Sequence, residues 1–160
     1  MNGKLCFDLV SFLREKNIKI STAESCTGGL LSKYITDQPG ASEIFECGVV
    51  SYSGKIKNKL LSVSEETLSA YGEVSDETAR EMAVGVRALA QSDLSVGITG
   101  IAGPGGGSEA KPVGLVYFAV SYRDEVRSVR LELFDLGDRS KVREATVECV
   151  LRFILNWIQS

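Results

Sequence analysis

The amino-acid sequence predicts an α/β fold with three layers, α/β/α, around a mixed and mostly parallel sheet of about five strands. Two observations lead to this prediction. Helix and strand patterns alternate through the first two thirds of the chain, and two strand-like segments then follow one another as a hairpin. The chain has 160 residues, of which 44% are hydrophobic, without an internal repeat or an interdomain linker. We therefore expect one domain, residues 1–160, with a proper core.

The first half of the chain predicts helix and strand in alternation and then two short helices. Apolar residues at helical spacing indicate the helices, and β-branched and aromatic runs indicate the strands. Ser64 precedes one helical segment and is its predicted N-cap. The helices are expected at residues 4–16, from Leu30 to before Pro39, at 55–61 and at 64–71, and the strands at 18–22 and 45–53.

The second half predicts a longer helix, three strands and a long C-terminal helix. Ser75 is the expected N-cap of the first of these helices, whose apolar positions 79–90 follow the 3.6-residue period. Strands are expected at residues 94–99, 113–122 and 126–134. The apolar stripe of residues 138–158 is explained by core packing and equally by a homo-oligomer interface.

Charge and composition exclude several classes of function. A net charge of −3 with a pI of about 5.1 leaves no broad electrostatic footprint for nucleic acid. The apolar stretches are shorter than the roughly 18 residues that a membrane span requires, and the N-terminus has no continuous signal-peptide core. We therefore expect a cytoplasmic protein with neither nucleic-acid nor membrane partners.

The chain contains no histidine, and this is its most informative compositional feature. Ser-His-Asp and Cys-His catalysis are excluded, because both depend on an imidazole base. The four cysteines are widely spaced without a CxxC pair, so we expect no metal site. An enzyme with this composition must use Lys, Tyr, Asp, Glu or Cys.

Ser25 lies in the connection between a predicted strand and a predicted helix, beside two glycines. Open α/β folds place ligands at this edge of the sheet. The backbone amides of Cys26, Thr27 and Gly28 come at or near the helix start, where free N–H groups and the helix dipole suit an oxyanion. The alternative is that Ser25 or Thr27 only caps the helix.

Tyr52 and Lys57 lie where the second strand ends and a helix begins. A serine nucleophile needs a proton acceptor, and Lys57 is eligible if its pKa falls from about 10.4 to about 7–8. Lys55 and Lys59 are close in sequence, and three lysines in five residues are equally typical of a solvated face.

A glycine-dense loop, residues 100–107, follows the third strand and lets backbone amides approach a ligand closely. It lacks the Lys-Ser/Thr ending of a P-loop, and an ordinary surface loop is the alternative. Lys111 at its exit, and Arg139 and Arg143 on one face of the last helix, are candidate phosphate ligands. Each of these cations also fits a solvated or ion-paired surface position.

Taken together, four motifs resemble the CinA C-terminal domain family, the nicotinamide-nucleotide amidases also called PncC. The resemblance covers nearly the whole chain in order. Its motifs are residues 23–29 (AESCTGG), 48–53 (GVVSYS) with Lys57, 99–106 (TGIAGPGG) running on to 111–114 (KPVG), and 137–139 (GDR) with Arg143.

The resemblance implies an activity, which is hydrolysis of nicotinamide mononucleotide to nicotinate mononucleotide and ammonia. It implies Ser25 as the catalytic serine, Lys57 as the catalytic lysine and Tyr52 as the catalytic tyrosine. In the mechanism we hypothesise, Lys57 accepts the proton of Ser25, directly or by a relay through the Tyr52 hydroxyl. We expect the small nucleotide to be held without any cofactor or metal. The expected substrate-binding residues are Thr99, Gly100, Ala102, Gly103, Gly105, Gly106, Lys111, Arg139 and Arg143.

Two alternatives stay open at this stage. Cys26 is a rival nucleophile from the same turn, although it lacks a histidine partner. The chain also departs from the family at Gly54, where relatives commonly have Asn. This departure admits a catalytically weak or inactive module that binds pyridine nucleotides or has a regulatory role.

Overall fold

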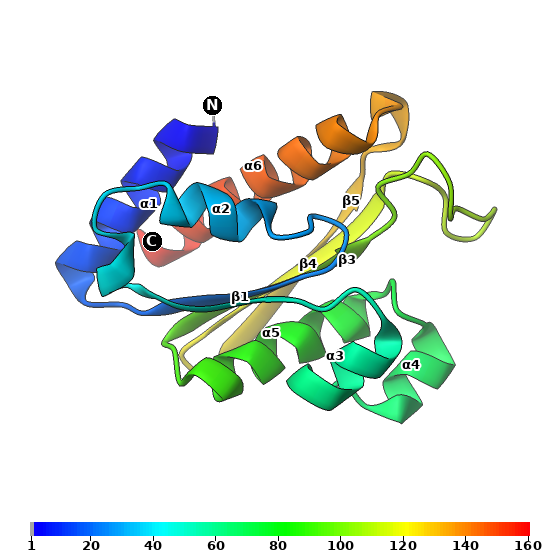
Figure 1. The fold of residues 1–160 in the computed structure, drawn as a ribbon, viewed down its shortest axis with the longest axis horizontal. Coiled ribbons are helices and arrows are strands. Elements are labelled where there is room, and N and C mark those ends of the chain that lie inside the picture. Colours follow the sequence, from blue (N-terminus) through cyan, green and yellow to red (C-terminus); the bar gives the residue numbers. More distant parts are fainter. Residues whose placement is uncertain (1) are drawn as a thin grey trace.

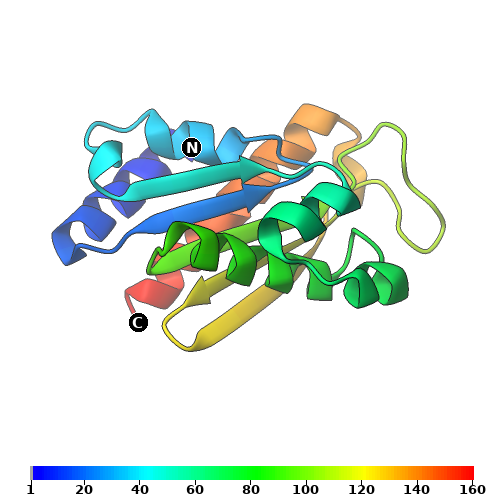
Figure 2. The same cartoon turned by 60° about the horizontal axis from the view of Figure 1, so that its bottom comes forward.

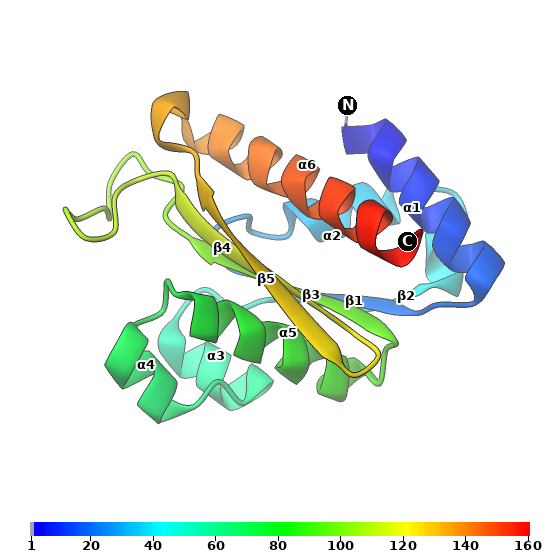
Figure 3. The ribbon, with the colours of Figure 1, turned by 180° about the vertical axis from the view of Figure 1, so that it is seen from behind.

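The computed structural model describes residues 2–160, which form one five-stranded sheet between two layers of helices (Figure 1). The views from the front and from behind agree on which helices cover each face (Figures 1 and 3). This arrangement confirms the predicted three-layer fold. One face carries α1 (Asn2–Lys16), α2 (Leu30–Thr36) and α6 (Arg139–Ile158), and the other carries α3 (Gly54–Leu61), α4 (Glu65–Tyr71) and α5 (Asp76–Ala90).

The sheet has the strand order β2-β1-β3-β4-β5 (Figure 2). β1 pairs in parallel with both β2 and β3, whereas β4 is antiparallel to both β3 and β5. The sheet is therefore mixed, with one reversed strand, as predicted. The strands are β1 (Ile20–Glu24), β2 (Phe45–Val50), β3 (Leu94–Gly100), β4 (Leu115–Tyr122) and β5 (Glu125–Glu132).

All five predicted strands have slightly different ends in the structure, and two of these differences bear on the site. β1 is Ile20–Glu24 rather than residues 18–22, because the Ile18 amide donates to the Leu13 carbonyl and so closes the end of α1. β2 stops at Val50 rather than at residue 53, because the Ser53 side chain accepts from the Ile56 amide as the N-cap of α3. Glu24 thus belongs to the strand, directly before the turn that carries Ser25.

The observed helix ends agree with the predicted ones better than the strand ends do. Ser64 and Ser75 cap α4 and α5 as predicted, each accepting a hydrogen bond from the amide three residues further on. Val142, Val150 and Ile154 of α6 are fully buried against the sheet, so core packing accounts for this part of the apolar stripe. Among residues 2–160, no helix is long and apolar enough to cross a membrane.

The three parallel strands end together, and this places the loops that follow them side by side. Glu24 of β1 is in register with Val50 of β2 and with Ile98 of β3. The loops after these strands and the start of α6 gather at one end of the molecule (Figure 1). Parallel α/β sheets bind ligands at this edge.

Candidate active site

A buried carboxylate holds the turn between β1 and α2. Glu24 is fully buried and accepts hydrogen bonds from the amides of Gly29, Leu31 and Ser32 at 2.8–3.1 Å and from the Ser32 hydroxyl at 2.7 Å. These contacts satisfy amides at the start of α2 that have no partner within the helix. The N-cap of α2 is Gly29 without a side-chain cap bond. Ser25 and Thr27 therefore do not cap this helix.

Ser25 and Lys57 are in direct contact although they come from different elements. The Lys57 Nζ lies 3.0 Å from the Ser25 Oγ and donates a second bond of 2.7 Å to the Ser51 carbonyl. Lys57 is 0% exposed, whereas Lys55 and Lys59 on the same helix are exposed. Of the three lysines, the structure thus places Lys57 within hydrogen-bond distance of Ser25, as a proton transfer between them requires.

The environment of Lys57 favours its neutral form. Burial lowers the pKa of Lys57 below its ordinary value, because desolvation penalises the ammonium; the negative charge of Glu73 and the Cys26 thiol act in the opposite direction. Of the residues described, no carboxylate lies within ion-pair distance of the Lys57 Nζ. A neutral amine beside a hydroxyl is the arrangement that activates a serine without histidine.

Cys26 lies in the same turn but is held as a thiol. Burial raises the pKa of Cys26 to about 12. The thiolate is the nucleophilic form of cysteine, so Cys26 is poorly suited to attack at neutral pH. The geometry favours Ser25 as the nucleophile over its neighbour.

The backbone amides of the turn are not equally available. The Gly28 amide donates to the Ser25 carbonyl at 3.0 Å, so it is already used within the turn. Within residues 2–160, the structure assigns no other residue as acceptor to the Cys26 and Thr27 amides. Cys26 lines the cavity beside Ser25, whereas Thr27 and Gly28 do not. Of the three predicted oxyanion donors, Cys26 is the one next to an open space.

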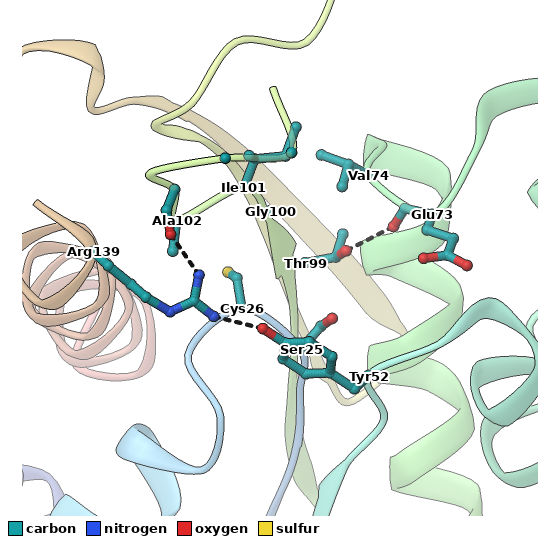
Figure 4. Close-up of a pocket in the computed structure, with 13 residues that line it drawn as sticks. Ser25, Cys26, Tyr52, Glu73, Val74, Thr99, Gly100, Ile101, Ala102 and Arg139 are labelled. Carbon is teal, nitrogen blue, oxygen red and sulfur yellow. Dashed lines mark hydrogen bonds between the residues drawn. The ribbon is translucent and has the colours of Figure 1, made fainter. Parts of the chain in front are cut away.

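A cavity of about 220 Å³ opens above Ser25. Figure 4 shows the Ser25 hydroxyl below Thr99, between residues of the glycine-dense loop and Tyr52. Most of the predicted substrate-binding residues are brought together here. The lining residues are Ser25, Cys26, Tyr52, Glu73, Val74, Thr99, Gly100, Ile101, Ala102, Gly103, Gly105, Gly106 and Arg139.

Tyr52 lies at the mouth of the cavity rather than between Ser25 and Lys57. Tyr52 is 60% exposed, and its hydroxyl accepts a hydrogen bond from the Arg139 Nη2 (Figure 4). Arg139 also donates to the Gly103 carbonyl at 2.7 Å. The expected proton relay through Tyr52 does not match this geometry, because Ser25 and Lys57 already touch.

Two predicted phosphate ligands point elsewhere. Arg143 donates to the Thr27 carbonyl through Nε at 3.0 Å and through Nη2, and a Cβ at Gly28 would lie 2.8 Å from that Nη2. Lys111 donates to the Tyr71 carbonyl at the end of α4. Neither residue lines the cavity. Arg143 instead braces the turn that carries Ser25, and Arg139 is the arginine that reaches the cavity.

Glu73 is a cavity residue that the sequence analysis missed. It precedes α5, and its carboxylate accepts a 2.7 Å hydrogen bond from the Gly54 amide. No local motif marks it, because a single glutamate in a loop is typical of a solvated surface. Its position is evident only from the contact between the starts of α3 and α5.

The comparisons with known proteins agree with this architecture. Residues 3–158 match the sequence profile of the CinA C-terminal domain. The chain belongs to this family. A CinA-like protein of Desulfovibrio desulfuricans is 56% identical over 118 residues, which are 74% of this chain and 28% of that protein. A competence-damage inducible protein of Caldicellulosiruptor bescii is 47% identical over 146 residues, 91% of this chain and 35% of the relative.

Solved structures show the same fold. The competence/damage inducible protein CihA of Agrobacterium tumefaciens matches with a TM-score of 0.93 and 38% identity, over 97% of this chain and 94% of that one. A CinA superfamily protein of Escherichia coli matches with a TM-score of 0.91 and 32% identity, over 97% and 89%. The chain spans about a third of the length of the curated relatives it matches. These names state a family and not a reaction.

Proposed function

We propose that this CinA-family chain is an amidohydrolase that deamidates nicotinamide mononucleotide by serine–lysine catalysis. The observation that carries the proposal is the buried 3.0 Å contact between the Lys57 Nζ and the Ser25 Oγ at the floor of an open cavity. The substrate comes from the family resemblance of the four sequence motifs. The geometry supports the reaction class, since an amide needs a strong nucleophile and a base.

In the proposed acylation, neutral Lys57 takes the proton of the Ser25 hydroxyl as the Oγ attacks the carboxamide carbon. The C–O bond forms, the carbonyl electrons move to oxygen, and the Cys26 amide stabilises the resulting oxyanion. The Lys57 ammonium then gives its proton to the amide nitrogen, the C–N bond breaks and ammonia leaves. Lys57 returns to its neutral form in this step.

In the proposed deacylation, Lys57 takes a proton from water, which attacks the ester carbon of the acyl-enzyme. The C–O bond to Ser25 breaks, and the Oγ recovers a proton from Lys57. Nicotinate mononucleotide forms as its carboxylic acid, which gives its remaining proton to solvent water and leaves as the carboxylate. Neither half-reaction requires a metal or a cofactor, because Ser25 and Lys57 carry out the proton transfers that accompany bond making and breaking.

The rest of the nucleotide is assigned to the cavity walls. Arg139 is the arginine of α6 that lines the cavity, and the glycine-dense loop after β3 contributes backbone close to it. A guanidinium binds phosphate well because it offers several N–H donors in one plane. We therefore assign the phosphate to Arg139 rather than to Arg143 or Lys111, neither of which lines the cavity.

The test is ammonia release from nicotinamide mononucleotide by the purified protein. Ser25→Ala and Lys57→Met are expected to lower kcat by at least about 10²-fold, in line with loss of a nucleophile or general base. Lys59→Met, which removes an exposed lysine from the same helix, is the matched control and should retain activity. Wild-type rates in both Ser25→Ala and Lys57→Met would end the mechanism.

Two further results separate the alternatives. Cys26→Ala should keep most of the activity, since the thiol is not the proposed nucleophile; a loss as deep as that of Ser25→Ala would transfer the role to Cys26. Tight binding of nicotinamide mononucleotide without turnover by the wild type would favour the inactive binding module that Gly54 admits.

A further inference from the structure

Arg139 joins two walls of the cavity that come from distant parts of the chain. Its Nη1 donates to the Gly103 carbonyl of the glycine-dense loop at 2.7 Å, and its Nη2 donates to the hydroxyl of Tyr52, between β2 and α3 (Figure 4). A guanidinium has five N–H donors, of which these two bonds use two. Within residues 2–160 the structure assigns no further acceptor to Arg139, so three donors remain for a ligand.

The Tyr52 hydroxyl keeps its own proton available. Its oxygen is the acceptor in the bond with Arg139, and among the described residues none accepts a hydrogen bond from its O–H. A phenol hydroxyl both accepts and donates, so one donor remains. Since the oxygen is hydrogen-bonded to the guanidinium, this O–H and the remaining N–H groups of Arg139 lie side by side at the cavity mouth.

The backbone of Tyr52 is held on both sides although its side chain is exposed. The Ser51 amide donates to the Glu24 carbonyl at 2.9 Å, and Ser53 is the N-cap of α3. Tyr52 belongs to none of the hydrophobic clusters that the described residues form. Core packing therefore does not explain a tyrosine at this position, whereas a role for its hydroxyl at the cavity mouth does.

The phosphate proposed at Arg139 carries more charge than one guanidinium neutralises. A phosphate monoester has about 1.5 to 2 negative charges at pH 7. Of the residues that line the cavity, Arg139 is the one cation, and Glu73 has the wrong sign for this ligand. A hydroxyl donor beside the guanidinium adds a charge-assisted hydrogen bond to a second phosphate oxygen.

We propose that Tyr52 is a substrate-binding residue whose hydroxyl forms, together with Arg139, a phosphate subsite at the cavity mouth. This subsite makes the cavity select a nucleotide over the corresponding nucleoside. The inference rests on the proposed function for the phosphate at Arg139. It goes beyond that function, because it gives Tyr52 a role in recognition in place of a proton relay between Ser25 and Lys57.

The two roles of Tyr52 predict different kinetics. A relay acts in the chemical step, so Tyr52→Phe would lower kcat for every substrate that places its carboxamide at Ser25. A phosphate ligand acts in binding, so Tyr52→Phe raises KM for the nucleotide and changes kcat little. A substrate without phosphate is then unaffected by the substitution.

The experiment compares nicotinamide mononucleotide with nicotinamide riboside, which has the same ring, carboxamide and ribose but no phosphate. Calorimetry in a Ser25→Ala background measures the dissociation constants without turnover. Ammonia release with Ser25 intact gives kcat for the nucleotide and kcat/KM for both ligands, the latter even where binding is weak. Tyr71→Phe is the matched control, because it removes the hydroxyl of an exposed tyrosine of α4 that does not line the cavity.

We expect Tyr52→Phe to weaken binding of the nucleotide by about three- to tenfold, the effect of one hydrogen bond to a charged group in contact with water. Binding and kcat/KM of the riboside should not change, and Tyr71→Phe should change neither ligand. An unchanged affinity for the nucleotide, equal weakening of both ligands, or equal losses of kcat/KM for both would overturn the inference.

A double variant tests whether the hydroxyl contacts the phosphate itself or only positions Arg139. In an Arg139→Ala background, Tyr52→Phe should still weaken binding of the nucleotide by about twofold or more, because the hydroxyl is a phosphate ligand in its own right. No further loss in that background would rule out the direct contact and with it the proposed subsite.

The proposed function is read out separately by ammonia release from the wild-type protein. Turnover of the nucleotide together with equal effects of Tyr52→Phe on both ligands would reject the phosphate subsite and leave the amidase. A phosphate-dependent loss of binding in Tyr52→Phe, without turnover by the wild type, would reject the amidase and leave the subsite.

Discussion

Gly85 offers a sharp test of the packing that positions Lys57. It lies in the middle of α5, where glycine is costly; helix propensity alone predicts that Gly85→Ala stabilises the protein by about 1 kcal/mol. The structure predicts the opposite. A Cβ at Gly85 would lie 1.9 Å from the carbonyl oxygen of Leu61, the last residue of α3, and within 2.9 Å of two more of its backbone atoms.

The magnitude follows from what must move. Because the opposing atoms are backbone, no rotamer change removes the overlap, and α3 must shift away from α5 by more than an ångström. Overpacking of this kind costs about 1–3 kcal/mol, and a backbone clash belongs at the upper end. After the gain in propensity is subtracted, we expect a net loss of about 2 kcal/mol, or a fall in Tm of roughly 4–8 °C.

The same shift has a functional consequence. Lys57 lies on α3, so a displacement of this helix lengthens the 3.0 Å contact with Ser25, and activity should fall even at temperatures where the variant is folded. Gly3→Ala is the control, because a Cβ at Gly3 in α1 meets nothing within 4 Å. Its Tm should be unchanged or slightly higher. A Tm for Gly85→Ala at or above the wild-type value would refute the packing argument.

Three further predictions concern the site. Burial lowers the pKa of Lys57, and only the neutral amine accepts a proton. The kcat/KM for nicotinamide mononucleotide should therefore rise with pH, with a midpoint below the ordinary lysine value of about 10.4. Lys57→Arg stays protonated and should be inactive at every pH of the profile. Arg139→Ala should raise KM by about tenfold or more with little loss of Tm, since Arg139 lines the cavity. Arg143→Ala should instead lower Tm and kcat together, since Arg143 holds the turn that carries Ser25. Equal effects of the two substitutions in steady-state kinetics and thermal melts would contradict the assignment. Glu24→Gln should lower the free energy of unfolding, measured in urea, by about 1–3 kcal/mol, because an amide cannot accept all four of the hydrogen bonds that the carboxylate accepts. A variant as stable as the wild type would contradict the role of Glu24 in the turn.

Local signals in the sequence were sufficient for most of the fold. The caps at Ser64 and Ser75 involve residues three positions apart, so the sequence alone predicts them. The ends of β1 were not predictable in the same way. Glu24 is a strand residue because its backbone pairs with β2 and β3 and its side chain is satisfied by α2, and a glutamate has no such preference by itself.

For the site, the sequence named the right neighbourhood but not every contact. Lys55, Lys57 and Lys59 are indistinguishable by composition, and only packing shows that Lys57 is the buried one. Arg139 and Arg143 share a face of α6 and lie one turn apart. Arg139 nevertheless reaches the cavity wall, whereas Arg143 donates to the Thr27 carbonyl. Side-chain direction at a crowded edge depends on neighbours from other elements, and helical spacing does not contain that information.

The burial of Lys57 is itself an argument for a role in chemistry. Burying an amine without a carboxylate partner lowers the pKa and costs stability at neutral pH, since the unfolded chain holds a proton that the folded state disfavours. A leucine or methionine would fill the same volume without that cost. The contacts of the Nζ are a serine hydroxyl beside an open cavity and one backbone carbonyl. Such a cost at the carboxyl edge of the parallel strands supports the proposed reaction site over a purely structural role for Lys57.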